Sequence, residues 1–205
     1  MQLRYALGAI AFGLGLGSAA LAFAAATVGQ PAPDFAVADT AGKPVKLSEL
    51  KGKTIVLEWT NHQCPFVGKH YDSGNMQKLQ KEATAKGVVW LTLVSSAAGE
   101  EGHVSPSQGE EIYRKWGAGF SHLLLDPEGK VGRAYGARAT PHMYVVAPDG
   151  RLAYMGAIDD KPSTRQGDIA GARNHVRAAL EEVAAGRPVA MPATQAYGCS
   201  VKYKG

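Results

Sequence analysis

Apolar runs and alternating segments divide this chain into short strands and helices. The run Thr54 to Thr60 is apolar and β-branched, which is typical of a strand buried on both faces, and Val88 to Val94 predicts a second such strand. Between them, apolar residues at mostly helical spacings predict a helix over Phe66 to Lys86. Two glycines weaken that helix, and we expect Gly74 to kink it.

The rest of the chain continues the alternation of strands and helices. A Pro-Asp-Gly turn at 148–150 predicts a hairpin, and Gly186 with Pro188 marks the end of the last helix. Near the N-terminus, the chain has an apolar alternation around Phe35 to Val37 and a turn at Gly42. The predicted elements are a helix from Pro106 to about Trp116, a strand His122 to Leu125, a helix Lys130 to Tyr135, strands Met143 to Val146 and Leu152 to Tyr154, and a helix Asp168 to Ala185.

The order of these elements predicts an α/β fold with a central mixed sheet covered by helices on both faces. With 205 residues, 45% of them hydrophobic and 20% charged, the chain fits one globular domain with short extras. The net charge of +4 is spread along the chain without a dense basic block, so nucleic acid is not an expected partner.

The first 24 residues have the layout of a secretory signal peptide. One cation, Arg4, precedes an uncharged Ala-, Leu- and Gly-rich run, and the small residues Ala22 and Ala24 suit cleavage before Ala25. The alternative is an uncleaved membrane anchor, because the uncharged run from Tyr5 to Val28 is long enough to span a bilayer. We therefore expect a periplasmic or secreted protein with no stable membrane contact once the leader is removed. The mature protein would consist of a domain at residues 25–187 and a tail at residues 188–205.

Cys64 lies where the first buried strand meets the next helix. Pro65 directly after it suits the first turn of a helix. A cysteine at a helix N-terminus is stabilised as a thiolate by the helix dipole and the free N–H groups, which predicts a reactive sulfur. The alternative is a buried, inert cysteine.

The segment WTNHQCPF around Cys64 resembles the active-site turn of thioredoxin-fold proteins, and the chain from about Val28 onward is similar to the peroxiredoxin-like branch of the redoxin (alkyl hydroperoxide reductase and thiol-specific antioxidant) superfamily. The resemblance includes Ala139-Thr140-Pro141-His142, similar to the Thr and cis-proline loop, the GAIDD segment at 156–160, and the terminal GCSVKYK. It implies a thioredoxin-like three-layer sandwich with an N-terminal hairpin extension.

The resemblance also implies chemistry for particular residues. Thioredoxins keep a second cysteine where this chain has Val67, so the partner of Cys64 must come from elsewhere, and the leading hypothesis is a bridge to Cys199. The alternative is a tail cysteine that stays unpaired or pairs between chains. Thr140 and Pro141 would press against the catalytic sulfur, and their backbone would bond to a substrate chain. Expected partners are protein or small-molecule thiols and disulfides, with no cofactor.

Other residues are candidates for the same site. Glu58, inside the apolar strand, should have a raised pKa and could exchange a proton with Cys64, unless its side chain faces outward. Asp159 and Asp160 could order the tail or bind a cation, although solvated surface charge is the simpler interpretation. The residues expected to line a substrate site are Trp59, Thr60, Pro65, Phe66 and Ala139.

Three functions remain open on the sequence. The first is an exported thiol-disulfide oxidoreductase with Cys64 as nucleophile and Cys199 as resolving cysteine. The second is a redoxin that binds substrate or metal without turnover; soft and borderline ligands for copper or zinc would come from His62, Cys64, His142 and Cys199. The third is a weak peroxidase with Thr60 near the thiol. Peroxidatic members of the superfamily also keep an arginine beside the thiolate, and here Arg138 is close to the site in sequence only.

Overall fold

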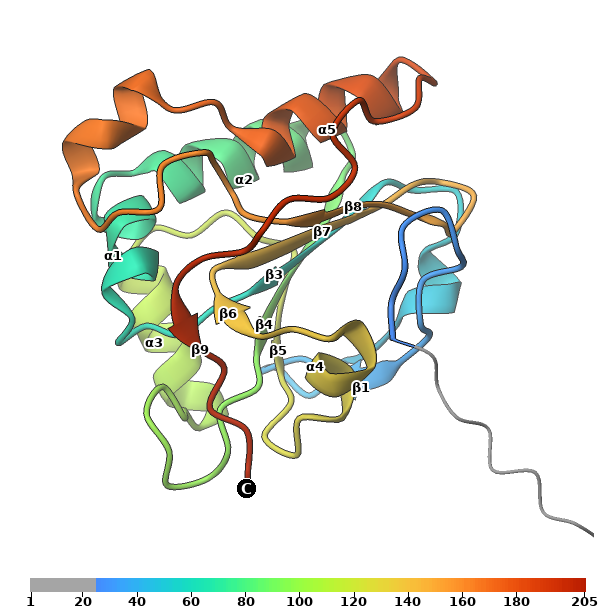
Figure 1. Cartoon of the computed structure of the whole chain (residues 1–205). Coiled ribbons are helices and arrows are strands. Elements are labelled where there is room, and N and C mark those ends of the chain that lie inside the picture. Colours follow the sequence, from blue (N-terminus) through green and yellow to red (C-terminus); the bar gives the residue numbers. More distant parts are fainter. Residues whose placement is uncertain (1–24) are drawn as a thin grey trace, which may run out of the picture.

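A computed structural model describes residues 25–205, so the predicted signal peptide lies outside the described residues (Figure 1). The central sheet has five strands in the order β5-β4-β3-β7-β8. Its first three strands run parallel, whereas β7 pairs antiparallel with both β3 and β8. The strands are β3 (Ile55–Trp59), β4 (Val89–Val94), β5 (His122–Leu125), β7 (His142–Val146) and β8 (Leu152–Gly156).

Side chains that alternate along the strands divide the core into two layers. On β3, Val56 belongs to the layer that packs against helices α1, α2, α3 and α5, and Leu57 belongs to the layer beneath α4 and the N-terminal hairpin. The predicted thioredoxin-like sandwich is confirmed. The helices are α1 (Pro65–Asp72), α2 (Asn75–Ala85), α3 (Pro106–Lys115), α4 (Lys130–Tyr135) and α5 (His175–Ala184), and the hairpin is β1 (Ala36–Ala38) with β2 (Pro44–Lys46), followed by the 3-10 turn η1 (Leu47–Leu50).

The helix predicted over residues 66–86 is two helices. Gly74 separates them in a left-handed conformation with φ of +76°, which a side chain would disfavour. Helix α1 ends at Asp72 and is capped by Ser73, whose hydroxyl donates to the carbonyl of Lys69 at 2.6 Å. The expected kink is therefore a full break between α1 and α2.

The predicted start of the last helix at Asp168 is wrong. The Asp168 carboxylate instead accepts hydrogen bonds from Ser163 and Arg165 within a 3-10 turn, η2 (Gln166–Gly171). Helix α5 begins after Asn174, whose side chain caps it by accepting the Arg177 N–H at 2.8 Å.

Within residues 25–205, none of the helices is both long and apolar enough to cross a bilayer.

Candidate active site

Cys64 is the N-cap residue of α1, after the short segment 60–63 that follows β3. Its N–H donates to the carbonyl of Asn61 at 3.0 Å, which closes a turn after the strand, and Pro65 occupies the first helical position. The Cys64 carbonyl accepts the N–H groups of Val67 and Gly68. The sulfur thus lies at the positive end of the helix, where a thiolate is favoured.

Cys64 is bonded to Cys199, and their Cα atoms are 6.0 Å apart. This confirms the intramolecular bridge expected from the sequence, across a separation of 135 residues. Cys199 lies in a short strand, β9 (Cys199–Ser200), which pairs antiparallel with β6 (Ala139–Thr140). Figure 1 shows the tail returning from α5 across the sheet to bring β9 beside β6. In this oxidised state only 1% of Cys64 is exposed.

The loop beside the disulfide has the expected conformation. The peptide bond between Thr140 and Pro141 is cis. The Thr140 carbonyl oxygen lies 3.2 Å from the Cys64 sulfur, and the Thr140 hydroxyl donates to the Cys199 carbonyl at 3.4 Å. Thr140 therefore contacts both halves of the disulfide bridge.

Glu58 lies in the same core layer as Cys64 and is fully buried. Removal from water raises the pKa of its carboxyl group, and hydrogen bonds to the carboxylate oppose that rise only in part. The expected raised pKa is confirmed, and the outward-facing alternative is wrong. The four donors are Tyr71 at 2.8 Å, Trp90 at 2.8 Å, Gln80 at 3.0 Å and Thr92 at 3.1 Å.

Comparison with known proteins identifies the family of this chain. The family model described as Redoxin matches residues 27–174, which is most of the chain. This chain belongs to the redoxin family.

This redoxin is similar to curated proteins and to solved structures. The thiol-disulfide oxidoreductase ResA of Bacillus subtilis is 28% identical over 124 residues, and the match covers 60% of this redoxin and 64% of ResA, less than two thirds of that relative. Among solved structures, an uncharacterized conserved protein from Geobacillus kaustophilus is 29% identical with a TM-score of 0.75, covering 87% of this redoxin and 93% of that chain. A hypothetical protein from Sinorhizobium meliloti is 25% identical with a TM-score of 0.75, covering 89% and 97%.

The remaining predicted site residues of the redoxin lie at different depths. Pro65 is exposed, and Phe66 is half-buried with its ring 5.9 Å from that of Tyr197 in the tail. Thr60 is buried and accepts a hydrogen bond from Tyr113 at 3.1 Å. Ala139 is buried in β6, opposite Ser200. These positions leave Pro65 and Phe66 as the candidates that a substrate could touch.

The expectation that Trp59 lines a substrate site is wrong. Its indole is fully buried in the core layer beneath α4, with its ring 5.4 Å from Tyr135 and 5.1 Å from Tyr144. The indole N–H donates to the Ser95 hydroxyl at 3.0 Å. Because side chains alternate along β3, Trp59 lies on the opposite face of the sheet from Glu58.

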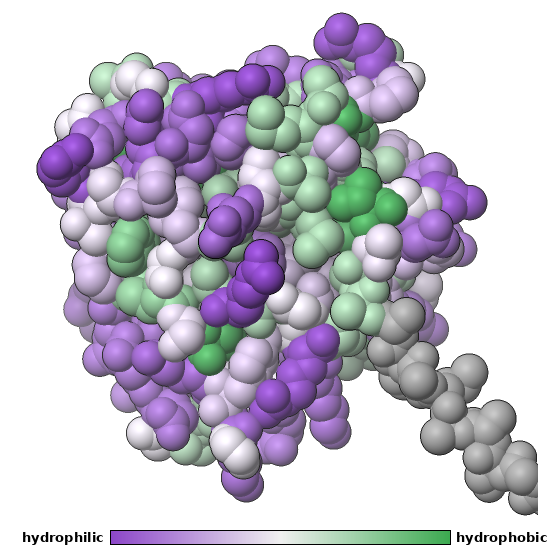
Figure 2. Space-filling view, in the orientation of Figure 1, coloured by the Kyte–Doolittle hydropathy of each residue, from purple (hydrophilic) through white to green (hydrophobic). Residues whose placement is uncertain are grey.

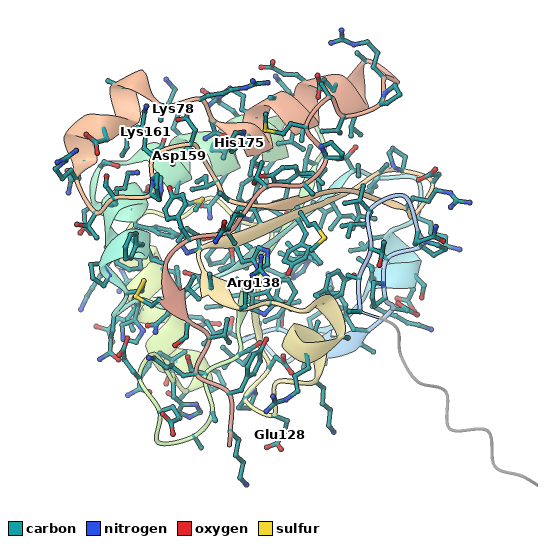
Figure 3. All side chains as sticks on the ribbon, in the orientation of Figure 1. Lys78, Glu128, Arg138, Asp159, Lys161 and His175 are labelled. Carbon is teal, nitrogen blue, oxygen red and sulfur yellow. A yellow bond between two sulfur atoms is a disulfide. The ribbon has the colours of Figure 1, made fainter. Side chains whose placement is uncertain are left out.

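The residues of the metal hypothesis are not gathered into one site. Among residues 25–205, no three His, Cys, Asp or Glu side chains are placed to hold a metal ion. His142 is buried, which lowers its pKa to about 3, and its ring nitrogen lies 3.1 Å from the Tyr144 hydroxyl. His62 is half-buried. Arg138, from the peroxidase hypothesis, is exposed beside β6 (Figure 3).

A buried polar cluster next to the tail was largely missed from the sequence. Asp159 is 2% exposed, so the interpretation of Asp159 as solvated charge is wrong, whereas Asp160 is exposed. The Asp159 carboxylate lies 3.4 Å from the buried ammonium group of Lys69 and accepts a hydrogen bond from Tyr197. It lies near Lys161 and His175 in the view of Figure 3. The available signal was the apolar pair Ala157 and Ile158 directly before it, which continues the buried strand β8.

Proposed function

We propose that this redoxin is an exported thiol-disulfide oxidoreductase that reduces protein or small-molecule disulfides. In its reduced form the Cys64 thiolate attacks a substrate disulfide, forms a mixed disulfide and releases the first substrate thiolate. The Cys199 thiolate then attacks the Cys64 sulfur, releases the second substrate thiolate and leaves the Cys64–Cys199 disulfide. Two electrons pass to the substrate, and an external dithiol reduces the enzyme again.

The observation that carries this proposal is the disulfide between a helix N-terminus and a strand of the tail, beside the cis-proline loop. The helix N-terminus favours the Cys64 thiolate as attacking and as leaving group. The similarity to ResA, which is named a thiol-disulfide oxidoreductase, supports the same class of reaction. Export rests on the predicted leader at residues 1–24, and the tail at 188–205 would carry the resolving cysteine of the domain at 25–187.

Glu58 would handle the proton of the Cys64 thiol. A carboxyl group with a raised pKa keeps its proton to a higher pH than an exposed glutamate does, and it can exchange that proton with a thiol. Tyr71 links the two groups structurally, because it donates to Glu58 and lies on α1, the helix that Cys64 caps. Thr140 and Pro141 would orient the sulfur through the backbone.

Reduction of insulin by dithiothreitol, followed by turbidity, tests the reaction. The wild type should accelerate precipitation, Cys64→Ser should not, and Cys199→Ser should be slower than the wild type because dithiothreitol must then resolve its mixed disulfide. Ser200→Ala is the matched control, because it changes an exposed side chain of the same strand. A Cys64→Ser protein as active as the wild type would refute the proposal.

A further inference from the structure

The tail that carries Cys199 is held by much more than the disulfide. Residues 192–204, here named the strap, run over β8, past the disulfide and on to α4. The space-filling view of the same face shows hydrophilic and hydrophobic residues mixed over the surface (Figure 2). The contacts of the strap fall on both sides of Cys199.

On the N-terminal side of Cys199, the strap binds to β8 and to the loop after it. The Thr194 N–H donates to the Met155 carbonyl at 3.1 Å, and the Thr194 hydroxyl accepts the Ala157 N–H at 2.9 Å. Closer to Cys199, the buried Asp159 carboxylate accepts the Tyr197 hydroxyl. A hydrogen bond to a buried carboxylate is among the stronger ones in proteins, so this side is fixed within two residues of the sulfur.

On the C-terminal side, the strap binds to α4 and to the loop after β4. The Ala97 N–H donates to the Lys202 carbonyl at 2.8 Å. The Tyr203 hydroxyl donates to the Ala137 carbonyl at 2.7 Å, and the guanidinium of Arg133 lies 4.5 Å from the Tyr203 ring centroid. None of these contacts involves the sulfur of Cys64 or Cys199.

Glycines at two contact points let the strap approach closely. At Gly198, which has φ of +135°, a Cβ atom would overlap the carbonyl oxygen of Thr140. At Gly132 in α4, a Cβ atom would overlap the Tyr203 hydroxyl, although the backbone there has ordinary helical geometry. Alanine would favour the helix at that second position, so the glycine serves the strap rather than α4.

Between the contacts on its N-terminal side and those on its C-terminal side, referred to below as the flanking anchors, the strap forms β9, which occupies the backbone edge of β6. Thr140 pairs with Cys199 and Ala139 pairs with Ser200. An extended substrate chain that added itself to this edge would need the same backbone groups. The edge is therefore filled by the protein's own chain.

We propose that the strap stays docked after the disulfide is reduced and competes with substrate chains for the β6 edge. The reduced Cys64 is then shielded, and it reacts when residues 198–200 lift from β6 while the flanking anchors keep Cys199 nearby. The partner that fits the vacated edge is an extended segment next to a disulfide, able to displace a two-residue strand. This inference rests on the proposed function in that Cys64 is the nucleophile being shielded.

The test measures how fast Cys64 reacts with 5,5′-dithiobis(2-nitrobenzoate) in full-length Cys199→Ser, where one thiol remains and displaces one nitrothiobenzoate. We expect slow reaction in this parent and about tenfold faster reaction when Gly198→Ala or Gly132→Ala is added, since each removes strap contacts equivalent to one or two hydrogen bonds. Gly167→Ala is the matched control, because its Cβ atom meets no neighbour within 4 Å.

If the parent reacts as fast as both variants, the strap does not shield Cys64. The proposed function is then left intact. Slow reaction in every folded variant overturns both proposals, because Cys64 is then unreachable even without the strap. Hydrogen exchange on the reduced wild type gives a second measurement that needs no variant. The Ala97 amide should remain protected there, and fast exchange at Ala97 would contradict the docked strap.

Discussion

Reducing the Cys64–Cys199 disulfide should cost the protein several kcal/mol of stability. The bridge closes a loop of 135 residues. In the chain-entropy model, a loop of this length lowers the entropy of the unfolded chain by an amount worth roughly 5 kcal/mol at 25 °C. Native disulfides deliver about 2 to 5 kcal/mol in practice. We therefore expect Cys199→Ser to lower the free energy of unfolding by about 3 to 5 kcal/mol.

The structure places this cost almost entirely in the unfolded state. The strap has its own contacts to β8 and α4, so we expect the folded state to lose little when the sulfurs separate. By the thermodynamic cycle that links folding to disulfide reduction, 5 kcal/mol makes the folded protein's reduction potential roughly 110 mV more negative than that of its unfolded chain. The stability lost on reduction and the shift in the reduction potential of the disulfide are thus two measurements of the same free energy.

Urea unfolding followed by circular dichroism is the appropriate assay. Oxidised wild type, wild type with dithiothreitol, and Cys199→Ser are compared at one pH. Dithiothreitol should destabilise the wild type to the level of Cys199→Ser and leave the variant itself unchanged. A difference below about 1 kcal/mol between oxidised and reduced wild type would refute the reasoning, because the loop term in the unfolded chain would then be absent.

Three further predictions concern buried ionisable groups. Asp159→Asn should lower the free energy of unfolding by about 3 kcal/mol, because it leaves the fully buried ammonium of Lys69 without its carboxylate. Burial lowers the pKa of His70 to about 4 and of His142 to about 3, so these rings stay neutral in the folded state while the unfolded chain binds protons. Stability should therefore fall as pH drops below 6.5, by up to about 1.4 kcal/mol per pH unit for each ring. Glu58 has the opposite sign: its raised pKa means that the folded state holds a proton the unfolded chain has lost, so its contribution should fall as pH rises above 4.5 through the folded pKa.

Each of these predictions has a control in the same chain. Asp160→Asn, next to Asp159 but exposed, should change stability by less than about 0.5 kcal/mol, and equal effects of the two variants would contradict a special role for Asp159. Urea unfolding of His70→Gln between pH 5 and 6.5, above the range where most carboxylates titrate, should show a shallower slope than the wild type. Glu58→Gln should remove the loss of stability at higher pH, and an unchanged pH profile would show that Glu58 does not titrate there.

The local features of the site were predictable from the sequence. The strand before Cys64 and the helix start after it are encoded by a continuous apolar run and by Pro65, which act over a few residues. The cis peptide bond before Pro141 and the bridge to Cys199 followed from a family resemblance, since neither is fixed by neighbouring residues alone.

Other features depend on contacts between distant segments. Asp159 could be read as surface charge because its partners, Lys69 and Tyr197, lie 90 and 38 residues away. Asp168 looked like a helix start, yet its carboxylate is used by Ser163 and Arg165, and Asn174 caps the helix instead. The strap carries few apolar residues at regular spacing, so no periodic pattern could predict it.

In the proposed reaction, Cys64 attacks the substrate disulfide and Cys199 resolves the mixed disulfide. Intact-mass spectrometry tests this assignment on reduced proteins mixed with glutathione disulfide and quenched with N-ethylmaleimide. We expect Cys199→Ser to accumulate one glutathione on Cys64, the wild type to end as the internal disulfide, and Cys64→Ser to acquire glutathione far more slowly. Equal labelling of Cys199 in Cys64→Ser, or a wild type that accumulates the adduct without closing its disulfide, would contradict the assignment.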